Sequence, residues 1–576
     1  MKLIQTLVLF ALTADVAFGQ LTVDQKIADF QSVAGLYAKR YAPYEWKRDA
    51  MAFDLLYLAP WMDRIVASRD DLDFYEIVSE YVSRLNDAHD TYTLPSNFTA
   101  TLNFSVDLYD TNELLVDSIN RTRLPAADFP FVTGYQLVSI DGQDAFSLLQ
   151  KFLRYQIAAN PRSTARFAAT LLTLRPQVLM PHAADVPEIS TVVFRRPDSQ
   201  LEAYRIPWVK TGLPLTAVGT YITPGVSLAQ APDDASPPEQ IPSYLAPLIR
   251  LQNCLIPYRT VLNFGALTPV FTPSLPSSFV RRLGAPTDPF YSGVFEAGGF
   301  KIGFIRIPNY SPTNTTAALT AFQREMAYFQ TNTDGLVIDE MRNPGGSVSY
   351  VNSILSLLMP TPWRAMGFEV RATSEWVISI SSSVEQAKAA GAPQSIIALL
   401  EKIKGAIVDA NAKFRGRTDP IPLDDVTLDR LPATDQQGNV LAYTKPLIVL
   451  IDELSASGGD AFAAGIQDNG RGPLVGWRTM GAGGSVGGWE AGTYSLGSTT
   501  VTESLMNRGR TIITPGLPWE LPYPPAPYVE NIGVSPDVSI DYMTSANLNE
   551  SGKPFVDAFV PIIVNEIVKR QSERRP

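Results

Sequence analysis

The stretch IDELSASGGDAFAAGIQDNG, from Ile451 to Gly470, places small residues between an apolar run and an amphipathic segment. The residues 447–451, LIVLI, predict a buried strand, and residues 460–467 predict a helix with Phe462 and Ile466 on its packed face. A tight strand-to-helix turn raises a side chain above the sheet edge and aims the first helical N–H groups at whatever lies beside it. The two serines and two glycines of this turn therefore mark a candidate site.

Ser457 is the candidate nucleophile of this turn. The N–H of Gly458, helped by the helix dipole, could stabilise an oxyanion, and glycine lets a substrate backbone approach closely. The alternative is that Ser455 or Ser457 only caps the helix, which is the commonest role of serine at that position. Taken alone, the stretch favours the cap.

A second strand-to-helix turn changes this balance. The stretch GLVIDEMRNPGGS, residues 335–347, places an apolar strand before an Asn-Pro-Gly-Gly-Ser turn and another helix. Turns at the carboxyl ends of parallel strands lie on one edge of the sheet, where such sheets form their sites. Gly345 or Gly346 could therefore donate a second N–H to the same oxyanion. A loop that needs positive φ would explain these glycines equally well.

Strands and helices alternate from Gly299 onward, which predicts an α/β fold with a mainly parallel sheet covered by helices. Upstream, the pattern from Asp71 to Leu85 predicts a helix, and residues 134–153 predict a strand, an Asp-Gly turn and a helix. We expect five regions: a signal peptide (1–19), a helical region carrying His89 (20–95), a module of strands and turns (96–211), a proline-rich insert or exposed linker (212–292) and an α/β domain (293–576).

The N-terminus predicts entry into a secretory pathway and an extracellular location. Lys2 is followed by a mostly apolar run and by a small-x-small cleavage pattern at residues 17–19. No second apolar run approaches the length needed to span a bilayer, so we expect no stable membrane insertion after signal removal. Six N-glycosylation sequons fit this route, at Asn97, Asn103, Asn120, Asn309, Asn314 and Asn549.

Composition excludes several classes of partner and cofactor. The net charge of the 576-residue chain is -11, and no long Lys/Arg run is present, which argues against a nucleic-acid partner. The one cysteine, Cys254, can form neither an intrachain disulfide nor a cysteine-based zinc site. We expect no metal and no organic cofactor.

The chain has only two histidines, His89 and His182. A serine nucleophile needs a base, and the histidine pKa suits that role near neutral pH. His89, in LNDAHDTYTL, follows the predicted Asp71–Leu85 helix, where a helix cap would be the simpler explanation. His182, in a proline-flanked loop, is interpreted as an exposed bystander.

Four ordered motifs, IGFIRIP, GLVIDEMRNPGGS, PLIVLIDELSASGGDAFAAGIQDNGR and ENIGVSPDV, resemble the catalytic domain of S41 (tail-specific) serine peptidases over about residues 299–542. The upstream NDAH and a passage resembling the core of a PDZ module, residues 134–153, extend the likeness over most of the chain. The resemblance implies an S41 peptidase core with an N-terminal helical region and a PDZ-like insert. It also implies Ser457 as the nucleophile and Gly458 and Gly345 as oxyanion donors.

One departure selects a branch of that family. Tail-specific members place a base lysine in a G-K-G-T loop, whereas the matching loop here, MGAGGSVGG, has Ala482 at that position. The sequence is more similar to the histidine-using branch, which includes chlamydial secreted protease-like enzymes and tricorn cores. That branch implies His89 as base and a glutamate that orients it. Glu530, just before the G-V-x-P-D signature, is our choice, with Glu520 and Glu490 as alternatives.

The resemblance implies a secreted serine endopeptidase that uses a Ser-His-Glu mechanism on a peptide or protein substrate, with a homodimer as one option. Fungal S41 relatives of the ustiloxin and phomopsin type suggest a finer role, processing the precursor of a ribosomally made cyclic peptide. Two alternatives remain: a non-catalytic S41-like ligand-binding protein and an esterase with the same Ser-His site. A further hypothesis is that the insert, residues 212–289, covers the site until it is cleaved.

Overall fold

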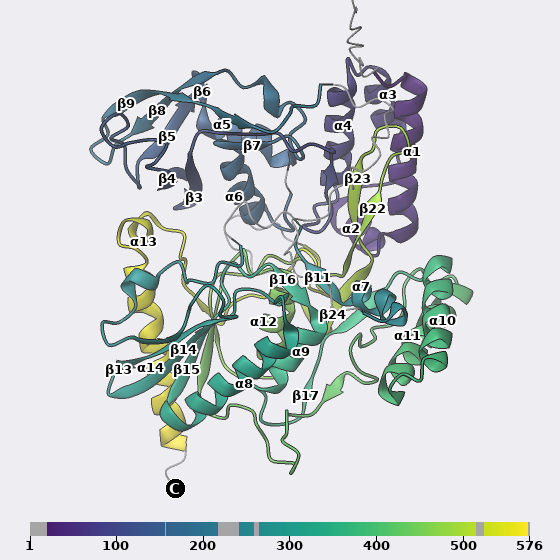
Figure 1. Ribbon diagram of the computed structural model, residues 1–576, viewed down its shortest axis with the longest axis vertical. Coiled ribbons are helices and arrows are strands. Elements are labelled where there is room, and N and C mark those ends of the chain that lie inside the picture. Colours follow the sequence, from purple (N-terminus) through teal and green to yellow (C-terminus); the bar gives the residue numbers. More distant parts are fainter. Residues whose placement is uncertain (1–19, 156, 217–240, 258–263, 514–522, 574–576) are drawn as a thin grey trace, which may run out of the picture.

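The computed structural model describes residues 20–155, 157–216, 241–257, 264–513 and 523–573. The predicted signal peptide, residues 1–19, lies outside this part of the chain. An N-terminal group of helices and a module built on an antiparallel sheet lie side by side, and a C-terminal α/β domain lies below both (Figure 1).

A seven-stranded sheet forms the centre of the C-terminal domain, in the order β12-β13-β14-β15-β20-β21-β26. The five strands from β14 to β26 are parallel, and β12 and β13 add an antiparallel edge. The predicted α/β class with a mainly parallel sheet is confirmed. The strands are β12 (Val280–Leu283), β13 (Tyr291–Ala297), β14 (Phe300–Arg306), β15 (Gly335–Asp339), β20 (Leu447–Ile451), β21 (Leu474–Gly476) and β26 (Val538–Ser539).

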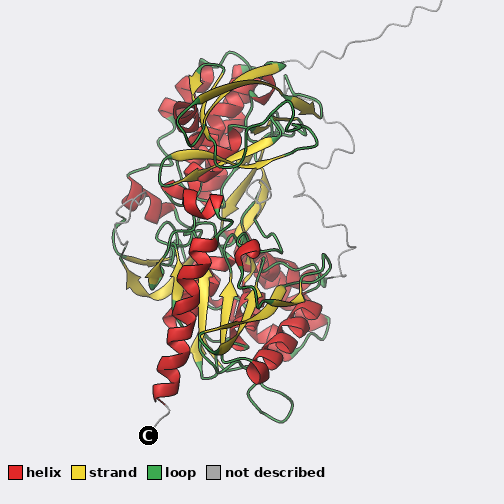
Figure 2. Ribbon diagram, turned by 90° about the vertical axis from the view of Figure 1, so that its left-hand side faces the viewer, coloured by secondary structure: helices red, strands yellow, loops and turns green. Residues whose placement is uncertain are grey.

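The two faces of this sheet are covered by different helices. Leu447, Val449 and Ile451 of β20 join the core beneath α8, α9 and α12, whereas Ile448 and Leu450 join the core beneath α14. Burial on both faces explains why this strand is apolar throughout instead of alternating. Figure 2 shows α14 running along the sheet. The helices are α8 (Thr315–Asn332), α9 (Val348–Ser356), α12 (Gly458–Asp468) and α14 (Lys553–Glu573).

The N-terminal region is helical, as predicted. Its helices are α1 (Val23–Arg40), α2 (Tyr44–Met51), α3 (Ala59–Val66) and α4 (Asp71–Ser83), and α4 ends two residues before the expected boundary. Asp70 begins α4 because its carboxylate accepts a hydrogen bond from the N–H of Asp73 at 2.8 Å. Aromatic side chains of α1 and α4, among them Phe30, Tyr37 and Tyr81, form the core of this region.

A hairpin of the C-terminal domain reaches up to these helices (Figure 1). It consists of β22 (Val486–Glu490) and β23 (Ser498–Thr502), and β23 pairs with β1 (Tyr92–Thr93), which follows α4 by a short loop. Residues 84–91, which carry His89, are thereby held between α4 and a strand of the distant domain.

The second region has a sheet in the order β3-β4-β5-β8-β9, with β6 paired to β5. The predicted strand, turn and helix of residues 134–153 are confirmed, and both turn residues, Asp141 and Gly142, have positive φ. Assignment of this module as PDZ-like stays a prediction. Its elements are β2 (Thr99–Thr101), β3 (Phe104–Tyr109), β4 (Glu113–Ile119), β5 (Gln136–Ile140), β6 (Gln143–Asp144), α5 (Ala145–Phe152), α6 (Pro161–Leu171), β7 (Leu174–Pro176), β8 (Ile189–Arg195), β9 (Leu201–Pro207) and β10 (Val209–Thr211).

The interpretation of residues 212–292 as an exposed linker is wrong for much of their described part. Residues 217–240 lie outside the described residues, but α7 (Ala246–Gln252) and β11 (Asn253–Leu255) are folded against the C-terminal domain. Leu251 and Cys254 are fully buried in its core, and β12 forms the sheet edge. The proline content of this segment led to its interpretation as a linker, although some of its apolar residues are buried in the folded chain.

Short strands and a helical hairpin complete the C-terminal domain. The hairpin of α10 (Ser374–Ala389) and α11 (Gln394–Ala412) packs on α7 and projects to one side (Figure 1). The remaining elements are β16 (Gly345–Ser347), β17 (Trp363–Arg364), β18 (Gly367–Val370), β19 (Asp429–Arg430), β24 (Ser504–Ile512), β25 (Ala526–Tyr528) and α13 (Ser545–Asn549).

Candidate active site

The turn after β20 gives its two serines different roles. Ser455 is a structural residue, because its hydroxyl donates to the backbone carbonyl of Glu340 at 3.0 Å. Ser457, the N-cap residue of α12, has φ +59° and ψ −107°. That conformation is sparsely populated by non-glycine residues, and a strained strand-to-helix turn is how hydrolases expose a nucleophile. The strain singles out Ser457.

The second predicted turn lies directly against this one. A Cβ added at Gly345 would meet the backbone N of Gly458 at 2.5 Å and the Cβ of Ser457 at 2.8 Å. A Cβ added at Gly458 would lie 2.9 Å from the backbone N of Gly346. The glycines therefore allow two backbones to approach more closely than any larger residue permits. The two turns meet at the carboxyl edge of β15 and β20, as parallel strands require.

His89 reaches this edge from the N-terminal region. Its Nε2 lies 2.7 Å from the hydroxyl oxygen of Ser457, across 368 residues of sequence. The side chain of Thr500 in β23 donates to the backbone carbonyl of His89, and the N–H of Thr502 donates to Asp90 at 2.8 Å. The hairpin therefore fixes the loop that carries the imidazole.

The environment keeps His89 neutral. Burial lowers its pKa to about 4, the nearby Lys47 ammonium acts in the same direction, and Asp87 opposes both. A neutral imidazole can accept the serine proton at Nε2 when its own proton is on Nδ1. At neutral pH the pair thus has the protonation state that a general base needs.

Glu530 lies in the same buried cluster, but no hydrogen bond joins it to His89 among the described residues. It pairs with the buried ammonium of Lys47 and accepts the N–H of Gly483 at 2.8 Å. Burial and the charge of Asp87 raise the pKa of Glu530 to about 8, against the effect of Lys47. The alternatives are placed less favourably, because Glu490 is exposed on β22 and Glu520 lies outside the described residues.

The backbone N–H groups around Ser457 are unequally engaged. The N–H of Ser457 donates to Asp460 at 2.7 Å, and that of Gly345 donates to the Asn343 side chain at 2.9 Å. Gly458 is the first residue of α12, so its N–H has no acceptor within the helix. Of the two predicted donors, Gly345 already donates its N–H to the Asn343 side chain, and the oxyanion role of both stays a prediction.

Ala482 stands where the tail-specific branch has lysine, and it is fully buried. Its N–H donates to the Asp460 carboxylate at 3.0 Å, and the N–H of Gly481 donates to the same group at 2.9 Å. Asp460 thereby ties the Ser457 turn to this loop. Sequence reasoning did not assign roles to Asp460, Lys47 or Asp87, although an acidic residue three positions after a helix N-cap is a readable signal.

The site is covered in this structure. Ser457 and His89 are both fully buried, and β11 pairs antiparallel with β16, the strand of the Gly-Gly turn. Arg250 anchors the preceding helix α7 through two hydrogen bonds to Glu503, at 2.7 and 2.6 Å, and lies over the ring of Trp489. Both reacting groups are therefore closed off from solvent in this structure.

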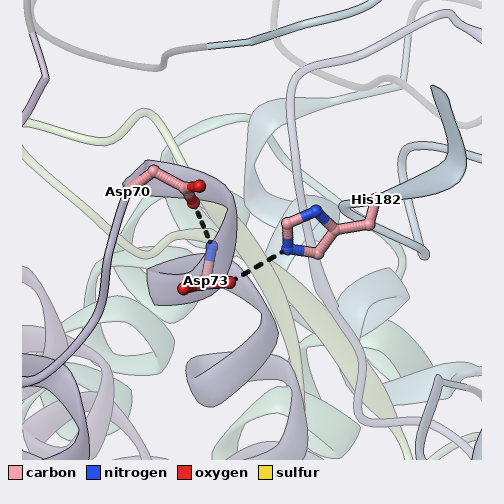
Figure 3. A group of neighbouring side chains, drawn as sticks. All are labelled: Asp70, Asp73 and His182. Atoms are coloured by element: carbon pink, nitrogen blue, oxygen red, sulfur yellow. Dashed lines mark hydrogen bonds and ion pairs between the residues drawn. The ribbon is translucent and has the colours of Figure 1, made fainter. Parts of the chain in front are cut away.

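His182 lies away from this site, in a cluster with Asp70 and Asp73 that has the donor types of a metal site (Figure 3). Its Nε2 lies 3.2 Å from Oδ1 of Asp73. The His182 side chain is 26% exposed, which is less than the interpretation as an exposed bystander implied. The carboxylate of Asp70 caps α4, and that of Asp73 accepts two hydrogen bonds from the Arg69 guanidinium. These bonds account for the cluster without an ion.

The surface features are compatible with the sequence predictions on processing. Each of the six sequon asparagines is at least partly exposed, and Asn97, Asn120, Asn314 and Asn549 are exposed. Within the described residues, no helix combines the length and the apolar character that crossing a bilayer demands. Glycosylation itself stays a prediction.

Residues 301–518 match the model of Peptidase family S41. A protein of Chlamydia pneumoniae is 24% identical, with 95% of this chain and 91% of that protein covered, and a protein of Chlamydia trachomatis serovar D is 23% identical, with 91% and 89% covered. The structure of mature CPAF complexed with lactacystin has a TM-score of 0.72 and 21% identity, over 95% of this chain and 99% of CPAF. A second structure of mature CPAF gives 0.71.

The site and these comparisons define the class of protein. The chain is a serine peptidase, as its match to that family model indicates. The match covers residues 301–518, and the fold of CPAF extends over 95% of the chain.

Proposed function

We propose that this chain is a secreted endopeptidase in which Ser457 is the nucleophile and His89 the general base. Ser457 Oγ attacks a peptide carbonyl while its proton passes to Nε2 of His89, which then protonates the departing amine. Water hydrolyses the acyl-enzyme by the reverse transfer and restores the serine. The observation that carries the proposal is the 2.7 Å contact between these two buried groups.

The oxyanion of the tetrahedral intermediate would lie at the N-terminus of α12. The N–H of Gly458 and the helix dipole both stabilise negative charge there. Gly345 is the second proposed donor, and its present bond to Asn343 holds its peptide group beside Ser457. Each such donor contributes roughly 3–4 kcal/mol to lowering the barrier.

Glu530 belongs to this proposal as a member of the buried cluster beside the base. It is tied to Lys47 and to the N–H of Gly483, so its role would be to hold the surroundings of His89 in place and not to bond the imidazole directly.

The two alternatives are weighed against the same geometry. A non-catalytic binding protein would have no need for the strained backbone of Ser457 or for its contact with His89. An esterase would use the same groups, and the family of the domain favours peptide bonds over esters. Reaction with a fluorophosphonate probe tests the nucleophile, and cleavage of a peptide library tests the substrate class.

We expect the wild type to be labelled at Ser457 and to cut peptides, the Ser457→Ala variant to do neither, and the His89→Ala variant to be slowed by roughly 10²- to 10⁴-fold. The probe is also applied after limited proteolysis, because the site is covered. Absence of labelling at Ser457 both before and after limited proteolysis would refute the proposed peptidase mechanism.

We further propose that α7 and β11 form the resting cover of the site. The sequence suggested that residues 212–289 cover the site. Because α7 and β11 pack against the C-terminal domain, we assign the cover to residues 246–255 within that segment. Deletion of residues 212–289 would remove core side chains and a sheet edge, so a cleavage site engineered within residues 217–240 is the better test. Unchanged activity after complete cleavage there would contradict the cover.

The finer substrate expectation, a repetitive precursor of a ribosomally made cyclic peptide, requires the same chemistry. An extended chain of such a precursor would enter where β11 now pairs with β16. Incubation with a synthetic precursor of several repeats, followed by mass spectrometry, tests it: cuts confined to repeat boundaries support the role, and scattered cuts refute it.

A further inference from the structure

The Nδ1 atom of His89 is buried and has no hydrogen-bond partner among the described residues. If Nε2 accepts the Ser457 proton, then Nδ1 carries a hydrogen that needs an acceptor. A buried donor without one is unfavourable, and native proteins rarely leave such groups unpaired. The identity of the acceptor decides which side chain orients the base.

Asp87 is the one described carboxylate within ion-pair distance of the His89 ring. Its Oδ1 lies 3.8 Å from Nδ1, and both side chains are fully buried. The same Oδ1 accepts the backbone N–H of His89 at 3.0 Å, which ties the two residues together in a tight turn. The hydroxyl of Tyr41 donates to Oδ2 at 3.0 Å and fixes the other oxygen.

Glu530, by contrast, has both carboxylate oxygens engaged. One pairs with Lys47 and the other accepts the N–H of Gly483 at 2.8 Å. Lys47 also donates to Asn531 at 2.7 Å and to the backbone carbonyl of Asn86 at 2.9 Å, so its three hydrogens are all used. The Lys47–Glu530 pair is therefore a closed unit beside the imidazole.

We propose that Asp87 is the positioning residue of this site: its carboxylate accepts the Nδ1 hydrogen of His89 as the imidazolium forms, while Lys47 neutralises Glu530. The proposal rests on the proposed roles of Ser457 and His89 and adds a residue to them. A closure of about 1 Å between Asp87 and Nδ1 would turn the present ion-pair distance into a hydrogen bond.

The charges around His89 support this division of roles. One oxygen of Asp90, on the same loop, accepts hydrogen bonds from the N–H and the hydroxyl of Thr502. Burial raises the pKa of Asp90 well above the usual range. Burial likewise favours the neutral form of Glu530, against Lys47. Both oxygens of Asp87 accept hydrogen bonds, one from the backbone N–H of His89 and the other from the hydroxyl of Tyr41.

Nuclear magnetic resonance of the full-length protein tests the proposal without relying on activity. The chain has only two histidines, so selective ¹⁵N-histidine labelling gives two ring systems, and the His182→Gln variant assigns them. In the resting protein we expect His89 as the Nδ1–H tautomer, with a proton resonance shifted downfield by the carboxylate. An Nε2–H tautomer would overturn the proposal.

The Asp87→Asn and Glu530→Gln variants remove one charge each with little change in shape. We expect Asp87→Asn to move the His89 resonance upfield, to lower kcat roughly 10²- to 10⁴-fold with KM little changed, and to displace the acidic limb of the kcat/KM pH profile. Glu530→Gln should leave the resonance near its wild-type position. The reverse pattern would assign the positioning role to Glu530.

The Tyr41→Phe variant keeps the test decisive even where Asp87→Asn does not fold. Loss of the Tyr41 hydrogen bond makes the Asp87 carboxylate a stronger acceptor, so the His89 titration should move to higher pH. An unmoved titration would count against the proposal. Failure of the proposed function looks different, since Ser457 would then stay unlabelled in the wild type whatever His89 does.

Discussion

Replacement of Gly345 by alanine tests the central packing of the site, the close approach of the two turns. The new Cβ would press on the carbonyl of Cys254, on the N of Gly458 at 2.5 Å and on the Cβ of Ser457 at 2.8 Å. The φ of this residue is +88°, so alanine is also strained by its backbone. The two effects can be separated with a matched control.

Gly299→Ala is that control. Gly299 has a similar φ of +80°, but a Cβ there would meet nothing within 4 Å. It directly precedes β14, so it lies at the amino-terminal ends of the parallel strands, away from the two turns. Both variants carry the backbone cost of about 1–2 kcal/mol. Only Gly345→Ala adds an overpacking cost of about 1–3 kcal/mol. The difference corresponds to roughly 2–10 °C in melting temperature for a domain of this size.

The activity assay gives the second readout. A displacement of the nucleophile by about 1 Å costs on the order of 10²-fold, so Gly345→Ala should slow fluorophosphonate labelling of Ser457 by about that factor. Gly299→Ala should label at the wild-type rate. Equal melting temperatures and equal labelling rates for the two variants would refute the claim that contact between the turns positions Ser457.

Three further predictions concern charge. Lys47→Met should lower the free energy of unfolding by about 3–5 kcal/mol, because Glu530 is left buried without its cation; thermal melting checks it, and Lys47→Met with Glu530→Gln should recover most of the loss. Arg250→Ala removes the anchor of α7 and should speed labelling of Ser457 about tenfold; an unchanged rate would argue that Arg250 does not hold the cover closed. Burial holds the folded pKa of His89 at about 4, against 6.5, so the unfolded state binds this proton first. The contribution of neutral His89 to the free energy of unfolding is fully present above pH 6.5, and about 3 kcal/mol of it is lost as the pH falls to 4. Melting temperatures measured against pH should show this loss in the wild type and not in His89→Gln.

The sequence predicted those features that depend on local periodicity and on turn chemistry. The apolar run at 447–451 is buried on both sheet faces, and the helix beginning at Asp71 starts where an aspartate can cap it. Small residues at 343–346 and 455–459 marked both turns, since close backbone approach leaves a readable trace in glycine. The fold class followed from the same alternation.

Features built from distant contacts were not readable. The proline-rich composition of 212–292 concealed α7 and β11, because their burial depends on surfaces supplied by other parts of the chain. Only the folded chain shows that Glu530 pairs with Lys47 and that Asp87 is the carboxylate within ion-pair distance of the His89 ring. The sequence does not show whether the oxygens of a carboxylate already accept hydrogen bonds from other groups.

The sequence by itself therefore determined which residues have reactive side chains and which segments are strands, helices and turns. Tertiary structure alone decided that His89 meets Ser457, because a hairpin from one domain pairs with a strand from another and carries the imidazole across 368 positions. The physical reason is range: periodicity and capping act over a few residues, whereas proton transfer requires two atoms in contact, and that contact is set by the packing of whole domains.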